Sequence, residues 1–117
     1  MEYLKLGLII LILDAIYVAF VASKFGNMIK NIQNKAIDLR YGSIIVCYIL
    51  ITFALNHFII QPNKPITDAF LLGICIYGVF DTVSFAIFKK WSLSLTIIDA
   101  LWGGVLFSLA TYIYRKL

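Results

Sequence analysis

The sequence has few charged residues, few cysteines and a single histidine, and each shortage excludes a class of protein. Only 14% of its 117 residues are charged, whereas about a quarter are charged in an ordinary soluble domain. No Cys/His cluster has zinc spacing, and the sequence contains neither a phosphate-binding glycine loop nor a nucleophile elbow. The two cysteines, Cys47 and Cys75, lie at different depths of apolar runs, which does not suit disulfide geometry. With 62% hydrophobic residues, the composition is typical of an integral membrane protein.

Four apolar runs are long enough to cross a bilayer, because a membrane-spanning helix needs about 20 predominantly apolar residues. They cover approximately residues 3–22, 41–61, 66–88 and 93–114. The first run is too long for the apolar part of a signal peptide and is interrupted by Asp14, so we expect it to be retained. The sequence therefore predicts an all-α fold, an integral membrane four-helix bundle formed by residues 1–117 as one transmembrane domain.

The connections between the runs predict how the chain is threaded. Pro62 and Pro65 cannot lie inside a helix, and the polar turn at residues 89–92 contains a tryptophan suited to the membrane interface. Residues 23–40 have apolar side chains at helical spacing with lysines between them, which predicts a short interfacial amphipathic helix between spans 1 and 2. The alternative is an extension of the first or second span beyond the bilayer. The apolar positions are Phe25, Met28, Ile29, Ile32, Ala36 and Leu39.

The distribution of basic residues predicts the orientation. The 23–40 connection and the 89–92 turn lie on one side and carry more lysines and arginines than the termini and the proline turn do. The positive-inside rule then places both termini outside the cytoplasm. The basic surplus indicates contact with anionic lipid headgroups and no binding of nucleic acid.

Three aspartates lie inside the apolar runs: Asp14, Asp81 and Asp99. Counted from the nearest helix end, each lies roughly 12–14 Å below the same membrane face. An ionisable residue at membrane depth is costly and usually has a partner or a function. Other polar or aromatic residues fall at similar depth or on the same helix faces, and we expect them to complete an intramembrane polar cluster: Tyr17, Tyr48, Thr52, Tyr77, Ser84 and Trp102. On the second span, Asn56 shares a face with Tyr48 and Thr52.

The first and last spans share a local pattern. Residues 12–17 and residues 97–102 both have two apolar residues, Asp, Ala, an apolar residue and an aromatic residue. Because these spans run in opposite directions, the repeat either marks a pseudo-twofold axis in the membrane plane or arises by chance.

The segments 13–17, 77–81 and 90–103 together resemble the domain of unknown function 2177 family of small four-span membrane proteins. The resemblance covers essentially the whole chain and implies the four-span fold and the aspartates, but no activity. The family pattern has an asparagine three residues after the third-span aspartate and a proline after the turn tryptophan. This chain has Ser84 and Ser92 there, so a ligand role of that asparagine would be altered.

Three functions remain open at this stage. Carboxylates at one depth suit a channel or carrier that handles protons or cations. A structural membrane or assembly protein, including a component of a virion membrane, would use the aspartates as hydrogen-bond links between helices. A lipid-modifying enzyme would hold a divalent cation with Asp14, Asp81 and Asp99.

No catalytic residue is assigned, since no nucleophile or acid–base pair has a recognisable spacing, and no cofactor is expected beyond a bound cation. The Phe- and Ile-rich outer faces predict either a homo-oligomer or lipid contact.

Overall fold

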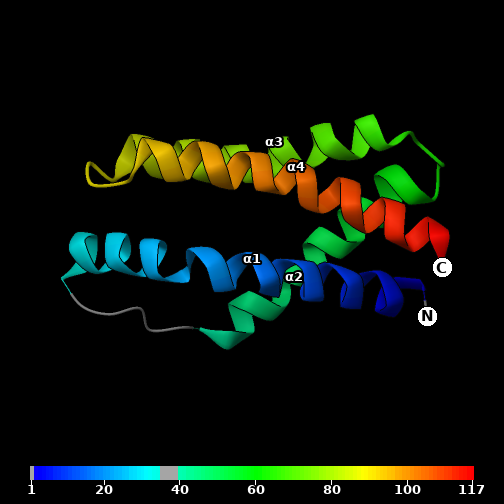
Figure 1. The fold of residues 1–117 in the computed structure, drawn as a ribbon, viewed down its shortest axis with the longest axis horizontal. Coiled ribbons are helices and arrows are strands. Elements are labelled where there is room, and N and C mark those ends of the chain that lie inside the picture. Colours follow the sequence, from blue (N-terminus) through cyan, green and yellow to red (C-terminus); the bar gives the residue numbers. More distant parts are fainter. Residues whose placement is uncertain (1, 35–39) are drawn as a thin grey trace.

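The computed structural model describes residues 2–34 and 40–117, and it confirms the all-α four-helix prediction. Helices α1 (Glu2–Gln33), α2 (Tyr41–Leu55), α3 (Ile66–Ile87) and α4 (Leu93–Lys116) run in alternating directions (Figure 1). A π-helix, η1 (Asn56–Ile60), continues α2. Both termini lie at one end of the bundle, opposite the turn between α3 and α4 (Figure 1).

The four long helices have the length and composition of membrane spans. Each contains an apolar window suited to crossing a bilayer, with η1 included in the second span. The bundle measures 44 × 25 × 21 Å, so its long axis exceeds the hydrocarbon thickness of about 30 Å. The chain is therefore a multi-pass integral membrane protein.

The turns end the helices by local chemistry. Pro65, which cannot donate a backbone hydrogen bond, occupies the N-cap of α3. Ser92 is the N-cap of α4, where its hydroxyl accepts a hydrogen bond from the Leu95 N–H at 3.2 Å. Arg115 reaches back from α4 and donates to the Lys64 carbonyl at 2.5 Å, which ties the proline turn to the C-terminus.

Helices α3 and α4 form the closest pair because two glycines meet at their crossing. A Cβ on Gly73 would lie 2.0 Å from the Gly103 carbonyl oxygen, and a Cβ on Gly103 would lie 2.5 Å from the Gly73 carbonyl oxygen. No other residue type allows the two backbones to touch in this way. The contact brings Asp81 of α3 and Asp99 of α4 onto neighbouring turns of a tight helix pair.

Helix α1 is longer than predicted. The prediction of a separate interfacial helix after the first span was wrong for residues 23–33. Residues 23–33 continue the first helix without a break, so the alternative, an extension of the first span, is what the structure shows there. Ala36 and Leu39 of the predicted helix lie outside the described residues. The predicted apolar face packs against the rest of the protein: Met28 is buried with Trp91 and Leu95, and Phe25, Ile29 and Ile32 surround them. Trp91, expected in the interface, is only 7% exposed.

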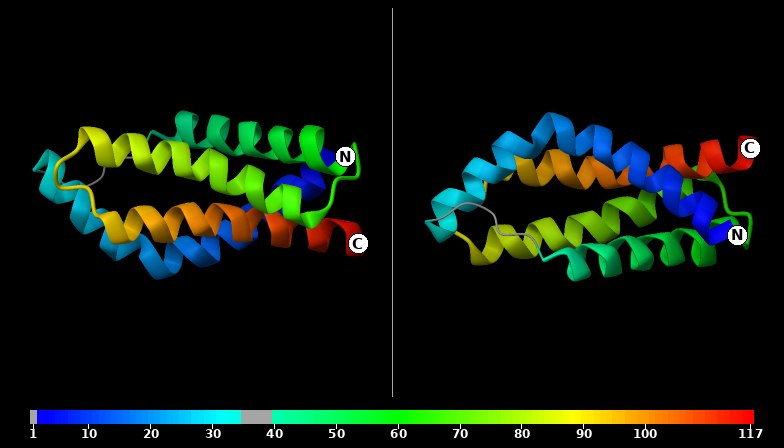
Figure 2. Two further views of the ribbon diagram at one scale, coloured as in Figure 1. Left: turned by 90° about the horizontal axis from the view of Figure 1, so that it is seen from above. Right: turned by 90° about the horizontal axis from the view of Figure 1, so that it is seen from below.

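Helix α2 is buried only toward its C-terminal end, where Ile51, Thr52 and Leu55 lie. It packs mainly on α1. Seen from above and below, α2 lies beside α3 at one side of the bundle and α1 lies beside α4 at the other (Figure 2). The main core fills the half of the bundle near the termini: Leu6, Ile10, Ile51, Leu55, Ile59, Ala69, Leu106, Phe107 and Ala110.

Candidate functional site

All three intramembrane aspartates point into the bundle. Asp81 is fully buried, and Asp14 and Asp99 are 7% and 9% exposed. Within the described part of the chain, the groups found against them are phenol, indole and carboxyl groups, not lysine or arginine side chains. The protein thus holds three acids at membrane depth without cationic compensation from those neighbours, an arrangement that is costly unless protons or hydrogen bonds offset it.

Asp14 links three helices through two hydrogen bonds. The Tyr48 hydroxyl of α2 donates to its Oδ2, and the Trp102 indole N–H of α4 donates to its Oδ1 at 3.0 Å. Both carboxyl oxygens therefore have a donor. Since α2 has few other buried contacts in its N-terminal half, the Tyr48 bond is a main attachment of that half to α1.

Asp14 and Asp99 exchange aromatic partners. The Tyr17 hydroxyl, three residues after Asp14, donates to Asp99 Oδ1 at 2.9 Å. Trp102, three residues after Asp99, donates to Asp14 in return. The Tyr17 and Trp102 rings are stacked between them, with centroids 4.6 Å apart and planes 4° apart. The repeated pattern in the first and last spans thus forms one reciprocal contact between antiparallel helices.

Asp81 differs from the other two aspartates. Neither of its oxygens receives a hydrogen bond from an N–H or hydroxyl group of the described residues. The Asp99 carboxyl lies close enough to interact with Asp81, and two ionised carboxylates in this position would repel each other. A proton held by either carboxyl would relieve this repulsion, so the Asp81–Asp99 pair is suited to share one proton.

The other residues of the predicted cluster take different positions. Tyr77 lines a cavity together with Asp99. Ser84 is buried, but its hydroxyl donates to the Phe80 carbonyl of its own helix at 2.9 Å, so this donor is turned away from Asp81. Thr52 is also buried and lines the groove between α1 and α2.

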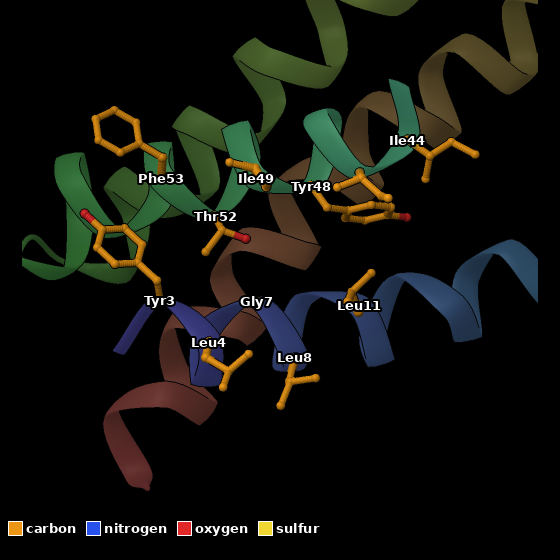
Figure 3. A pocket seen from close by; sticks show the side chains of 11 residues that line it. Tyr3, Leu4, Gly7, Leu8, Leu11, Ile44, Tyr48, Ile49, Thr52 and Phe53 are labelled. Atoms are coloured by element: carbon orange, nitrogen blue, oxygen red, sulfur yellow. The ribbon is translucent and has the colours of Figure 1, made fainter. Parts of the chain in front are cut away.

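Two apolar cavities flank α2. The cavity between α1 and α2 has a volume of about 620 Å³, and Figure 3 shows Leu11 of α1 pointing toward Tyr48 of α2 across it. The cavity between α2 and α3 has a volume of about 490 Å³ and reaches Asp99. The second cavity is thus lined by one of the aspartates, whereas the first is lined by Tyr48, whose hydroxyl donates to Asp14.

Two buried polar residues near the termini were not part of the predicted cluster. Asn56 in η1 and Thr111 in α4 are both fully buried, and their side-chain polar atoms have no hydrogen-bond partner among the described residues. Asn56 lies one helical turn after Thr52, so its face was visible in the sequence. Thr111 lies two turns after Gly104, on the face of α4 that the glycines mark.

The three aspartates are connected in the order Asp14, Asp99, Asp81. Asp14 is connected to Asp99 through the stacked Tyr17 and Trp102, and Asp99 adjoins Asp81. Within the described residues, no group of three or more His, Cys, Asp or Glu side chains is placed to hold a metal ion. These contacts suit hydrogen bonding and proton exchange.

Comparison with known proteins agrees with the architecture. The profile of a family described as "Predicted membrane protein (DUF2177)" matches residues 1–114. No curated protein and no solved structure gives a significant match. Since the match spans nearly the whole chain, this four-helix membrane protein belongs to the DUF2177 family.

Proposed function

We propose that the protein handles protons in the membrane and that the Asp81–Asp99 pair is the group that binds and releases them. The observation that carries this proposal is the position of Asp81: fully buried, without an N–H or hydroxyl donor among the described residues, and beside a second carboxyl. A purely structural aspartate would be expected to have donors, as Asp14 has. A carboxyl pair at membrane depth is a group typical of proton-linked carriers and channels.

The second carboxyl has a route to the bilayer and a stabilising contact. Asp99 lines the cavity between α2 and α3, so the pair is not sealed inside the bundle. The Tyr17 hydroxyl donates to Asp99, and such a bond offsets part of the charge that remains when the proton leaves. The Asp99 carboxyl is thus placed to carry a negative charge, whereas the Asp81 carboxyl is fully buried.

Asp14 has a different role from the Asp81–Asp99 pair, and this role is structural. Its two donors come from α2 and α4, so it joins these helices to α1 in the manner expected of an interhelical hydrogen-bond link. This observation favours the structural interpretation for Asp14, which has a donor on each oxygen, whereas Asp81 lacks such donors.

Proton flux in reconstituted vesicles tests the proposal. Purified protein would be inserted into liposomes containing a pH-sensitive dye, and an imposed pH gradient would be followed with time. Wild-type protein should dissipate the gradient faster than empty liposomes, and Asp81→Asn or Asp99→Asn should abolish the difference. Asp68→Asn, the same change in the first turn of α3, is the matched control and should keep the wild-type rate. Equal rates for all four proteins would contradict the proposal.

A further inference from the structure

We propose that the cavity between α2 and α3 binds a lipophilic monocation, which takes the place of the proton shared by Asp81 and Asp99. This inference rests on the proposed function and adds a substrate class to it. It is carried by the cavity, by the Asp99 carboxyl in the cavity lining, and by Asp81, which adjoins Asp99 and has no N–H or hydroxyl donor among the described residues.

The cavity opens toward the lipid. Of its lining residues, Val46, Leu50 and Phe80 are 53%, 61% and 59% exposed on the outer surface of a membrane-spanning bundle. Helix α2 packs mainly on α1, which leaves its side toward α3 open. A ligand would therefore enter sideways from the bilayer, and it must be soluble in lipid to do so.

The lining selects the chemistry of the ligand. The volume of about 490 Å³ lies within the range of about 300–1,000 Å³ found for pockets that hold drug-sized molecules. The walls are mostly apolar, with the aromatic rings of Tyr77 and Phe80 and the carboxyl of Asp99. A small hydrated ion would lose its water there without replacement, whereas a cation that carries apolar groups keeps them in contact with the walls. Aromatic rings and a carboxylate both attract a positive charge.

Charge balance links this cation to the proton. With one shared proton, the Asp81–Asp99 pair carries a single negative charge. If the proton leaves and a monocation binds, two carboxylates face one cation and the net charge at the site is again one negative. Among the described residues, the other titratable groups near the pair are Tyr17, Tyr48, Tyr77, Asp14 and Cys47, and none of these is a base that could supply the positive charge. The exchange is one cation in for one proton out.

Binding of tetraphenylphosphonium to the full-length protein in nanodiscs tests the inference. The matched probe is tetraphenylborate, which has the same shape and the opposite charge. Tetraphenylphosphonium should bind and release about one proton per cation into a weakly buffered solution, and tetraphenylborate should not bind. Asp81→Asn and Asp99→Asn should each weaken binding by roughly 30-fold or more, because each removes half of a buried charge partner. Asp68→Asn should bind as the wild type does.

A second readout locates the bound cation. Cys47 is a free thiol in the lining of the cavity, whereas Cys75 is a free thiol elsewhere on the surface of α3. In a Cys75→Ser background, tetraphenylphosphonium should slow alkylation of Cys47 by N-ethylmaleimide. In the reverse background, Cys47→Ser, it should leave the alkylation of Cys75 unchanged.

Three results would overturn the inference: equal binding of the two probes, unchanged cation binding in both aspartate variants, or cation binding that does not protect Cys47. Failure here is separable from failure of the proposed function. If vesicles show aspartate-dependent proton flux but the protein binds no tetraphenylphosphonium, the proton site stands and the cation substrate is wrong.

Discussion

Asp14 and Asp99 each accept a hydrogen bond from the aromatic residue that follows the other aspartate by three positions. Helical rise alone places the three aspartates at similar depth, and a sequence can therefore suggest that they belong together. It cannot assign their partners, which depend on the rotation of each helix about its axis. Ser84 illustrates the difference: its spacing puts it on the face of Asp81, but its hydroxyl bonds the Phe80 carbonyl one turn back, which a serine in an apolar helix can always do.

The reciprocal contact makes a testable prediction at this scale. Trp102→Phe keeps an aromatic ring for stacking on Tyr17 but removes the N–H that Asp14 Oδ1 accepts, and Tyr17→Phe removes the donor to Asp99. Each change should lower the free energy of unfolding by about 0.6–2 kcal/mol, the usual worth of an interhelical hydrogen bond in a membrane. Thermal unfolding in one detergent measures it. Tyr112→Phe, which alters an exposed tyrosine of α4, is the control and should be neutral. Stabilities identical to wild type would show that these bonds are not structural.

Among the helices, the close contact of α3 with α4 could be predicted from the sequence. The length of α1 was harder to predict. Small residues at Gly73, Gly103 and Gly104 indicate close packing in any membrane bundle, and the structure has it at those positions. The amphipathic pattern of residues 23–33 is the same whether its apolar side meets headgroups or protein. The structure provides a protein surface, since Trp91 and Leu95 at the start of α4 cover Met28. No local pattern in the sequence could choose between these two surfaces.

Ser92 makes two contacts in this packing. Its backbone N–H points at the Met28 sulfur, 3.0 Å away, and its hydroxyl caps α4. A proline has neither group. Ser92→Pro would therefore remove the contact between the extended α1 and the turn.

The glycine contact gives the prediction for helix packing. Gly103→Ala would place a Cβ 2.5 Å from the Gly73 carbonyl oxygen and from the Tyr77 ring, so α3 and α4 must move apart. We expect a loss of about 1–3 kcal/mol in the free energy of unfolding, the usual cost of overpacking. Gly78→Ala is the matched control on the same helix pair, because its Cβ would meet only the Ala100 methyl group at 4.0 Å. If both variants unfold at the same temperature, the close approach of the two backbones is not what holds the pair.

For the molecule as a whole, the fold class follows from composition because backbone groups in lipid must be satisfied within helices or closed barrels. Four apolar runs of this length predict membrane-spanning helices, and the described residues form four such helices. The outer faces expose many Ile, Leu and Phe side chains, as lipid contact requires. Lipid tails and a second copy of the chain can cover such apolar faces equally well. Self-association therefore stays a prediction. Cross-linking in nanodiscs, with a monomer-only result counting against it, is the check.

Orientation in the membrane is also a whole-molecule prediction. Both termini lie at one end of the bundle (Figure 1), and the opposite end carries Lys24, Lys30, Lys89 and Lys90. The positive-inside rule then predicts that both termini are outside the cytoplasm. Reporter fusions at Met1 and Leu117 should both be active only as extracytoplasmic reporters. Cytoplasmic activity at both ends would reverse the orientation and leave the fold unchanged.

Asp81 and Asp99 are proposed to share one proton as a pair, and infrared spectroscopy of their carboxyl groups tests this most directly. In wild-type protein at neutral pH, the spectrum should contain the band of one protonated, hydrogen-bonded carboxyl. Asp81→Asn and Asp99→Asn should each remove or shift this band, whereas Asp14→Asn should keep it, because Asp14 has its own donors. A wild-type spectrum with every carboxyl ionised at neutral pH, or a band that is unchanged in Asp81→Asn, would contradict the proposal.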